Sequence, residues 1–407
     1  MTREELLALI AQAADEGWKK LNLAGKGLTE LPEEICKLTQ LETLTLGRWV
    51  KRYGWIGNQL TRLPESIANL TQLKTLNLSS NELTQLPEAV THLTQLRTLS
   101  LSFNELTQLP EAITHLTQLR TLFLSGNELT RLPESIANFT QLRALNLSRN
   151  QLTQLPEAIA NLTQLRALNL SGNELTQLPE AITHLTQLKT LDLSFNQLTR
   201  LPEAITHLTQ LRALNLSRNQ LTQLPEAIAN LTQLSMLDLS FNELTQLPEA
   251  ITHLTQLRTL SLSFNQLTQL PEAITHLTQL RTFSLYYNKI ETFPDWLEDL
   301  RNLKTLDLRG NPLPISPEVL DSPDSIEAIF NYHRQLRSGK VRPLNEAKLL
   351  LIGQGSVGKT SLINRLIHNR YNRDQPQTDG LNVETWSVHV NSKDVRLNVW
   401  DFGGQEI

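Results

Sequence analysis

The chain has 407 residues, which is too many for one compact hydrophobic core, so two or more structural units are expected. Its net charge of -4 gives no general reason to expect a nucleic-acid-binding protein. A single cysteine, Cys36, excludes an internal disulfide, and no apolar run approaches the roughly 18 residues of a membrane helix. Because the N-terminus also lacks a signal-peptide pattern, the sequence predicts a cytoplasmic protein without membrane insertion.

Residues 1–17 predict a helix that caps the first coil of the repeats that follow. Leu6, Leu7, Leu9 and Ile10 supply an apolar face. Thr2 is a candidate N-cap, and Glu5 stands three residues later, as in a capping box.

Residues 18–325 are dominated by a repeat of 23 residues, which runs from Leu73 to Asn302 ten times without insertion or deletion. Its frame, LxxLxLxxNxLxxLPxxIxxLxx, is the leucine-rich-repeat signature. The two leucines of LxL point to one face of a short strand, and the proline suits the start of a short helical turn. We therefore predict an α/β fold: a solenoid of about 13 coils with a curved parallel sheet.

An asparagine ends each strand, and in leucine-rich repeats this residue holds the backbone of neighbouring coils together. The predicted ladder consists of Asn81, Asn104, Asn127, Asn150, Asn173, Asn196, Asn219, Asn242, Asn265, Asn288 and Asn311.

The outward positions of the strands form the concave face, where a protein or peptide partner is expected to bind. The second position of each unit is basic except at Ser235, and Phe123 interrupts a polar row at the fifth position. One interpretation is a basic stripe for an acidic protein or peptide. The other is a solvated face copied by duplication and balanced by the glutamates that follow each proline. The basic residues are Lys74, Arg97, Arg120, Arg143, Arg166, Lys189, Arg212, Arg258, Arg281 and Lys304.

One insertion, at residues 47–57, interrupts the uniform repeats. It places Trp49, Tyr53 and Trp55 beside Lys51 and Arg52, a composition typical of interface centres. The alternative is a loop that folds back onto its own coil.

A helical linker is predicted over residues 326–346, and the composition changes at Ala347. Lys348–Ile352 is an unbroken apolar run that predicts a buried parallel strand. Residues 353–360 follow at once and match the phosphate-binding pattern GxxxxGK[ST], and residues 359–369 then predict a helix. Its glycines let backbone N–H groups converge on phosphates at the positive end of that helix.

Further short motifs follow in the order of a small GTPase. Thr378 lies in a polar loop, where such proteins place a magnesium-binding threonine. Residues 385–390 and 395–400 predict a pair of strands, and the second strand leads into a DxxG motif that begins at Asp401. Gln405 occupies the slot that orients the attacking water, so it is the candidate catalytic residue.

These motifs predict a site for GTP or GDP with Mg²⁺. The predicted magnesium ligands are Thr360, Thr378 and Asp401. The predicted nucleotide-binding residues are Gly353, Gly355, Ser356, Val357, Gly358, Lys359, Thr360, Ser361 and Gly404.

The order of repeats, helical connector, phosphate loop and Asp401-Phe-Gly-Gly-Gln-Glu406 resembles the N-terminal part of bacterial Roco proteins. This resemblance implies that residues 347–407 are the N-terminal half of a Roc GTPase domain, with slow GTP hydrolysis in a signalling protein. The family dimerises through a COR domain, which this sequence does not contain, and no kinase signature is present. The motif that reads guanine is also missing, so the chain looks truncated inside Roc. The alternative function is therefore a protein-binding scaffold with a vestigial nucleotide site.

Overall fold

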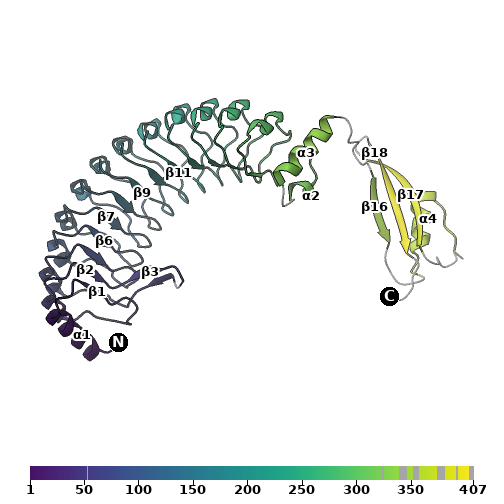
Figure 1. Ribbon diagram of the computed structural model, residues 1–407. Helices are drawn as coiled ribbons and strands as arrows, with labels where there is room; N and C mark the ends of the chain where they lie inside the picture. The colour runs from purple at the N-terminus through teal and green to yellow at the C-terminus, as the bar shows by residue number, and fades with distance from the viewer. Residues whose placement is uncertain are drawn as a thin grey trace. The chain divides into compact units, whose positions relative to one another are not determined.

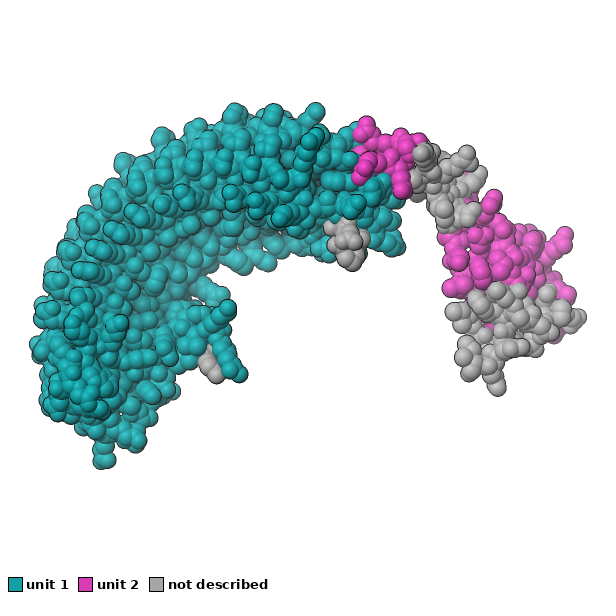
Figure 2. Space-filling model, viewed as in Figure 1, with its two compact units in different colours: residues 1–332 teal, residues 333–407 magenta. Residues whose placement is uncertain are grey.

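The computed structural model describes residues 1–52, 54–321, 325–338, 346–351, 357–373, 381–390 and 393–402. The chain divides into two compact units, residues 1–332 and residues 333–407, which are coloured separately in Figure 2. Each unit is described by itself below.

The first unit is a solenoid with a sheet of thirteen parallel strands, each of three residues. In Figure 1 the strands line the inner side of the arc and the 3-10 helices its outer side. The strand count agrees with the predicted number of coils. The strands are β1 (Lys20–Asn22), β2 (Thr43–Thr45), β5 (Thr75–Asn77), β6 (Thr98–Ser100), β7 (Thr121–Phe123), β8 (Ala144–Asn146), β9 (Ala167–Asn169), β10 (Thr190–Asp192), β11 (Ala213–Asn215), β12 (Met236–Asp238), β13 (Thr259–Ser261), β14 (Thr282–Ser284) and β15 (Thr305–Asp307).

A short 3-10 helix returns the chain along the convex side of each coil, and a proline precedes every one of these helices, as predicted. They are η1 (Glu33–Lys37), η2 (Glu65–Asn69), η3 (Glu88–His92), η4 (Glu111–His115), η5 (Glu134–Asn138), η6 (Glu157–Asn161), η7 (Glu180–His184), η8 (Glu203–His207), η9 (Glu226–Asn230), η10 (Glu249–His253), η11 (Glu272–His276) and η12 (Asp295–Asp299).

The predicted asparagine ladder is present, and all of its members except the partly buried Asn311 are buried. Asn196 shows its pattern: Oδ1 accepts the backbone N–H of Leu175 at 3.0 Å. Its Nδ2 donates to the carbonyls of Leu170 and Leu193, both at 3.0 Å. Each asparagine therefore joins two coils and satisfies backbone groups that leucine side chains shield from water.

A second ladder runs beside the asparagines, and the sequence analysis missed it. The residue before each asparagine adopts a left-handed backbone, where glycine is easiest, and Gly126, Gly172 and Gly310 hold three of these slots. Five consecutive slots instead carry large planar side chains that stack: Arg218 lies 4.8 Å and 4.0 Å from its two neighbouring rings, and the remaining rings stack at 4.1 Å and 5.0 Å. In chain order they are Phe195, Arg218, Phe241, Phe264 and Tyr287.

Both ends of the solenoid are closed. Helix α1 (Arg3–Asp15) covers the first coil, and Thr2 and Glu5 form the predicted capping box. At the other end lie α2 (Pro317–Leu320) and α3 (Ser325–Arg337).

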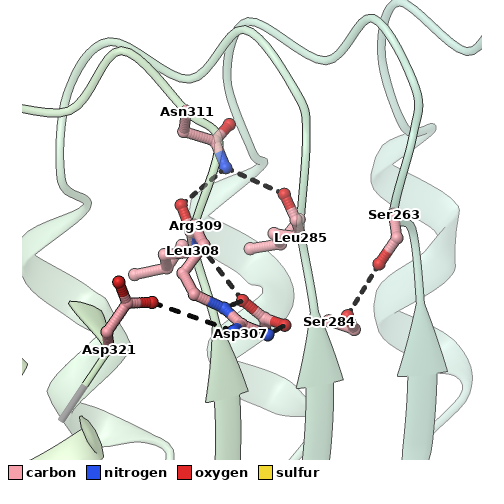
Figure 3. A network of polar contacts seen from close by, with 8 residues as sticks. All are labelled: Ser263, Ser284, Leu285, Asp307, Leu308, Arg309, Asn311 and Asp321. Carbon is pink, nitrogen blue, oxygen red and sulfur yellow. Dashed lines mark hydrogen bonds and ion pairs between the residues drawn. The ribbon is translucent and has the colours of Figure 1, made fainter. Parts of the chain in front are cut away.

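Figure 3 shows the polar contacts that close the last coil. Arg309 donates to both carboxylate oxygens of Asp307, at 2.9 Å and 2.7 Å, and lies 3.8 Å from Asp321. Asn311 ends the asparagine ladder by donating to the carbonyls of Leu285 and Leu308. The final strand is therefore held to the chain that leads away from it.

The insertion forms a hairpin of β3 (Arg48–Val50) and β4 (Gly54–Ile56). It does fold onto the solenoid, but beyond its own coil: the Trp55 ring lies 4.7 Å from the ring of Phe103. A Cβ at Gly47 would stand 1.5 Å from the carbonyl oxygen of Ser79, so the base of the hairpin needs glycine. Trp49 remains 58% exposed.

The second unit contains β16 (Glu346–Leu351), α4 (Lys359–His368), β17 (Leu381–Val390) and β18 (Lys393–Phe402), with strand order β16-β18-β17. β18 pairs in parallel with β16 and antiparallel with β17. Both strands of the predicted pair extend beyond their predicted bounds.

The prediction that the first strand of this unit is buried is wrong for much of its length. Leu350 is 52% exposed. Trp400 on β18 is the register partner of both Leu350 on β16 and Val383 on β17, and Val383 is also exposed. Helix α4 packs on the opposite face, where Val399 and Ile363 are buried. Among the described elements only α4 covers this sheet, so within them the apolar strand has a helix on one side and none on the other.

Candidate functional site

The phosphate-binding pattern leads into the N-terminus of α4. Gly358 is the N-cap and has a φ of 88°, a left-handed backbone that glycine adopts without strain. Lys359 and Thr360 are the first two residues of the helix, and both are partly buried. Since the first N–H groups of a helix lack partners within it, this end favours an anion such as phosphate.

Thr360 and Asp401 meet at this end of the helix. The Thr360 hydroxyl donates to Oδ2 of Asp401 at 2.5 Å, and Asp401 is only 1% exposed. Leu351, the last residue of β16, is paired with Asp401 in the parallel register. The last residue of β16 therefore lies beside Asp401 in the sheet.

A hydroxyl and a carboxylate in direct contact are oxygen donors of the kind that Mg²⁺ takes in phosphate-binding sites. They come from two motifs that are 41 residues apart in sequence. The residues present therefore fit a small divalent cation next to an anion-binding helix end.

Of the other predicted site residues, Val357 is 62% exposed before the helix and Ser361 is partly buried within it. The remaining predicted residues lie outside the described part of the chain, so their roles stay predictions. They are Gly353, Gly355, Ser356, Thr378, Gly404 and Gln405.

A further contact ties α4 to the sheet, and sequence reasoning missed it. His368 Nε2 lies 2.7 Å from Oε2 of Glu384, at the far end of the helix from Thr360. No motif signals this pair, because it depends on the register of β17 against β18.

The basic residues of the concave face form an in-register column. The N–H of Arg166 donates to the carbonyl of Arg143 at 2.8 Å, and the same backbone bond continues from coil to coil between Lys74 and Lys304, passing through Ser235 where the column is not basic. Glutamates such as Glu180 begin the 3-10 helices on the opposite side of each coil. They form no ion pair with the column within the described residues, so the proposed charge balance is not local.

Family models agree with this two-part architecture. A leucine-rich repeat region model matches residues 92–166, 156–239 and 203–312, which together exceed half of the chain. The model described as Ras of Complex, Roc, domain of DAPkinase matches residues 348–407. This chain is a leucine-rich-repeat protein with a Roc region.

Solved structures resemble the repeats of this leucine-rich-repeat protein. A leucine-rich-repeat protein of Leptospira interrogans gives a TM-score of 0.71 at 37% identity, covering 76% of this chain and 77% of that one. The Toll–Spätzle complex of Drosophila gives a TM-score of 0.62 at 27% identity, covering 80% of this chain and 43% of that one.

The Roc region resembles Ras-related proteins. Ras-related protein RGP1 of Oryza sativa subsp. japonica is 37% identical over 59 residues, which are 14% of this chain and 26% of that protein. Ras-related protein RABA1e of Arabidopsis thaliana is 41% identical over 59 residues, 14% of this chain and 27% of that protein. The chain thus spans about a quarter of the length of these relatives. None of the helices in its described part has the length and apolar character needed to cross a membrane.

Proposed function

We propose that the Roc region binds GTP or GDP with Mg²⁺ and hydrolyses GTP slowly, in a cytoplasmic Roco-type signalling protein whose repeats bind a protein partner. The observation that carries the nucleotide part is the Thr360–Asp401 contact at the N-terminus of α4. It joins a residue of the phosphate-binding pattern to the first residue of the DxxG motif. The matches to Ras-related proteins over the same region support guanine as the base.

The proposed roles follow from the chemistry of each side chain. The α4 N-terminus and Lys359 would hold the outer phosphates, and Thr360 and Asp401 would hold Mg²⁺. When bound, the ion would neutralise charge that develops on the phosphates. Gln405 would orient the attacking water, a role proposed from its place directly after the motif.

A titration of the full chain with fluorescent GDP and GTP in the presence of Mg²⁺ tests this function, with unlabelled ATP as competitor. Lys359→Ala should weaken binding at least about tenfold, because it removes the cation nearest the phosphates. Lys348→Ala is the matched control, since Lys348 lies on β16 with its Nζ 5.0 Å from the Trp400 ring. Equal affinity for ATP would contradict a guanine site.

A second candidate function is a protein-binding scaffold whose nucleotide site is inactive. The half-exposed Leu350 and Val383 favour it, because an open apolar sheet face is atypical of a finished parallel sheet. Absence of any nucleotide binding by a chain with folded repeats would select this alternative.

A further inference from the structure

A groove of about 410 Å³ lies on the concave face across β7 to β12. Its floor is made of small or apolar side chains. Ala144, Ala167 and Ala213 replace the threonine that most other strands carry at this position, and Phe123 and Met236 stand at the two ends. These two large side chains are 36% and 38% exposed. The groove is therefore less polar than the rest of the concave face.

Arginines flank one side of this groove. Arg143, Arg166 and Arg212 are exposed, and neighbouring coils lie about 4.8 Å apart, so each has a like charge on at least one adjacent coil. None of the three forms an ion pair with a carboxylate of the described residues. Lys74, in the same column, instead meets Glu42 at 2.7 Å. Among the described residues, the arginines beside the groove thus lack a carboxylate partner of the kind that neutralises Lys74 in the first coils.

Side-chain amides flank the other side. Asn146, Asn169 and Asn215 use Oδ1 to accept the backbone N–H two residues later, at 2.9 to 3.0 Å. This contact leaves each Nδ2 as a donor that bonds to none of the described residues. Asp192 and Asp238 interrupt the row, and both use a carboxylate oxygen for the same backbone contact. Most groups along both flanks are therefore hydrogen-bond donors.

We infer that this groove binds an extended acidic segment of a partner protein, with its chain running across the strands. The inference rests on the proposed protein-binding role of the repeats and names the chemistry of the partner. Carboxylates would face Arg143, Arg166 and Arg212, backbone carbonyls would face the amides, and small apolar side chains would lie on the alanine floor.

The length of the groove sets the length of the ligand. Six strands give five spacings of about 4.8 Å, or about 24 Å, which an extended chain covers with about seven residues. A nucleic-acid strand would satisfy the arginines through its phosphates but offers no aliphatic side chains for the floor between Phe123 and Met236. The floor is what favours a peptide.

A phage-displayed library of random 12-residue peptides, selected on the full chain, tests the inference. The selected peptides should be enriched in Asp and Glu over Lys and Arg, and should contain small apolar residues. Their affinity should fall at least about tenfold for the triple variant Arg143→Ser, Arg166→Ser, Arg212→Ser. Serine suits this slot, since Ser235 occupies it directly before β12 and donates its hydroxyl to the carbonyl of Arg212 at 2.9 Å.

Two further variants separate charge from the apolar floor. Phe123→Asn with Met236→Thr restores the usual residues of both positions and should weaken the same peptides by about three- to tenfold. Arg281→Ser changes the same column directly before β14, outside the groove, and should alter affinity less than twofold.

Several outcomes would overturn the inference. A library without acidic enrichment, or tighter binding of a nine-nucleotide oligouridine through the same arginines, would contradict an acidic peptide ligand. Enriched peptides that bind every variant equally would keep a protein-binding role for the repeats but place it elsewhere. Failure to enrich any peptide would contradict both the peptide site in the groove and the protein-binding role of the repeats. The nucleotide titration would still test the Roc site separately.

Discussion

Leu214 in the solenoid and Leu350 in the second unit are both strand leucines, yet the first is fully buried and the second is 52% exposed. Leu214 lies between Leu191 and Leu237, its register partners on the neighbouring coils. Leu350 has Trp400 beside it, but the described elements leave that face of the sheet uncovered. A solenoid coil receives its covering from copies of itself, whereas the three-strand sheet depends on elements of different sequence.

This difference shows how far an apolar pattern can be trusted. In the repeats every leucine of the frame packs against the equivalent apolar residue of the neighbouring coils. The periodic pattern therefore also predicts which leucines are buried. In the second unit the apolar run of β16 identified a strand correctly but did not determine what covers it. Burial there depends on long-range packing that no local pattern encodes.

The largest effect is expected from the asparagine ladder. Asn196→Ala would leave the Leu175 N–H without its partner in a buried site. It would also remove one of the two amide donors to the carbonyls of Leu170 and Leu193, whose other donors are neighbouring ladder asparagines. The three lost hydrogen bonds should together destabilise the solenoid by about 4 kcal/mol. The urea midpoint, followed by circular dichroism, measures this loss. Gln197→Ala, on the next and exposed residue, should change the midpoint little. Equal effects of the two substitutions would mean that the ladder does not stabilise the coils.

The next prediction compares the two leucines directly. Leu214→Ala should cost about 3 kcal/mol, because it opens a cavity in a closely packed coil. Leu350→Ala should cost less than about 1 kcal/mol, since half of that side chain already faces solvent. Hydrogen exchange of each unit separates the two effects. A large cost at Leu350 would show that this face is covered in solution.

The sequence predicted more of the solenoid than of its surface. The strands, the prolines before the 3-10 helices and the asparagine ladder follow from residue type and spacing. The stack from Phe195 to Tyr287 also repeats every 23 residues, but Arg218 interrupts its aromatic rings and the slot is polar or glycine in most other coils, so a search for apolar periodicity passes over it. The groove depends on Ala144, Ala167 and Ala213 being small, which is a signal only when neighbouring strands are compared.

The candidate nucleotide site was predicted by motif, and its central contact required the fold. Thr360 and Asp401 were each assigned to magnesium from separate patterns, and the parallel register of β16 and β18 brings them together. The His368–Glu384 pair had no comparable pattern. Motifs identify residues that bind a common ligand, whereas contacts that only hold elements together leave little trace in one sequence.

A smaller effect is expected at the Roc site itself. Thr360→Val keeps the shape of the side chain but removes the donor to the buried Asp401 carboxylate, and should destabilise the second unit by about 1–2 kcal/mol. Amide exchange in β16 and β18 measures this loss without nucleotide. Ser361→Ala, one residue later on α4, is the control and should change exchange less. Unchanged protection in Thr360→Val would show that the contact does not contribute to the apo fold.

The smallest effect concerns Lys74, the member of the basic column that pairs with a carboxylate. Hydrogen bonds from Lys74 and then Lys19 hold the pKa of Glu42 below its ordinary value of 4.5. A carboxyl group with a lowered pKa stabilises the fold above its unfolded pKa, and this contribution is lost as pH falls through the folded pKa. Glu42→Gln should therefore lower Tm slightly at neutral pH, and the difference should vanish below about pH 3. Arg166 has no such partner in the described part of the chain, so Arg166→Ser should raise Tm slightly at neutral pH by relieving repulsion. Tm measured against pH at low salt tests both signs, and a loss of stability in Arg166→Ser would contradict an unneutralised column.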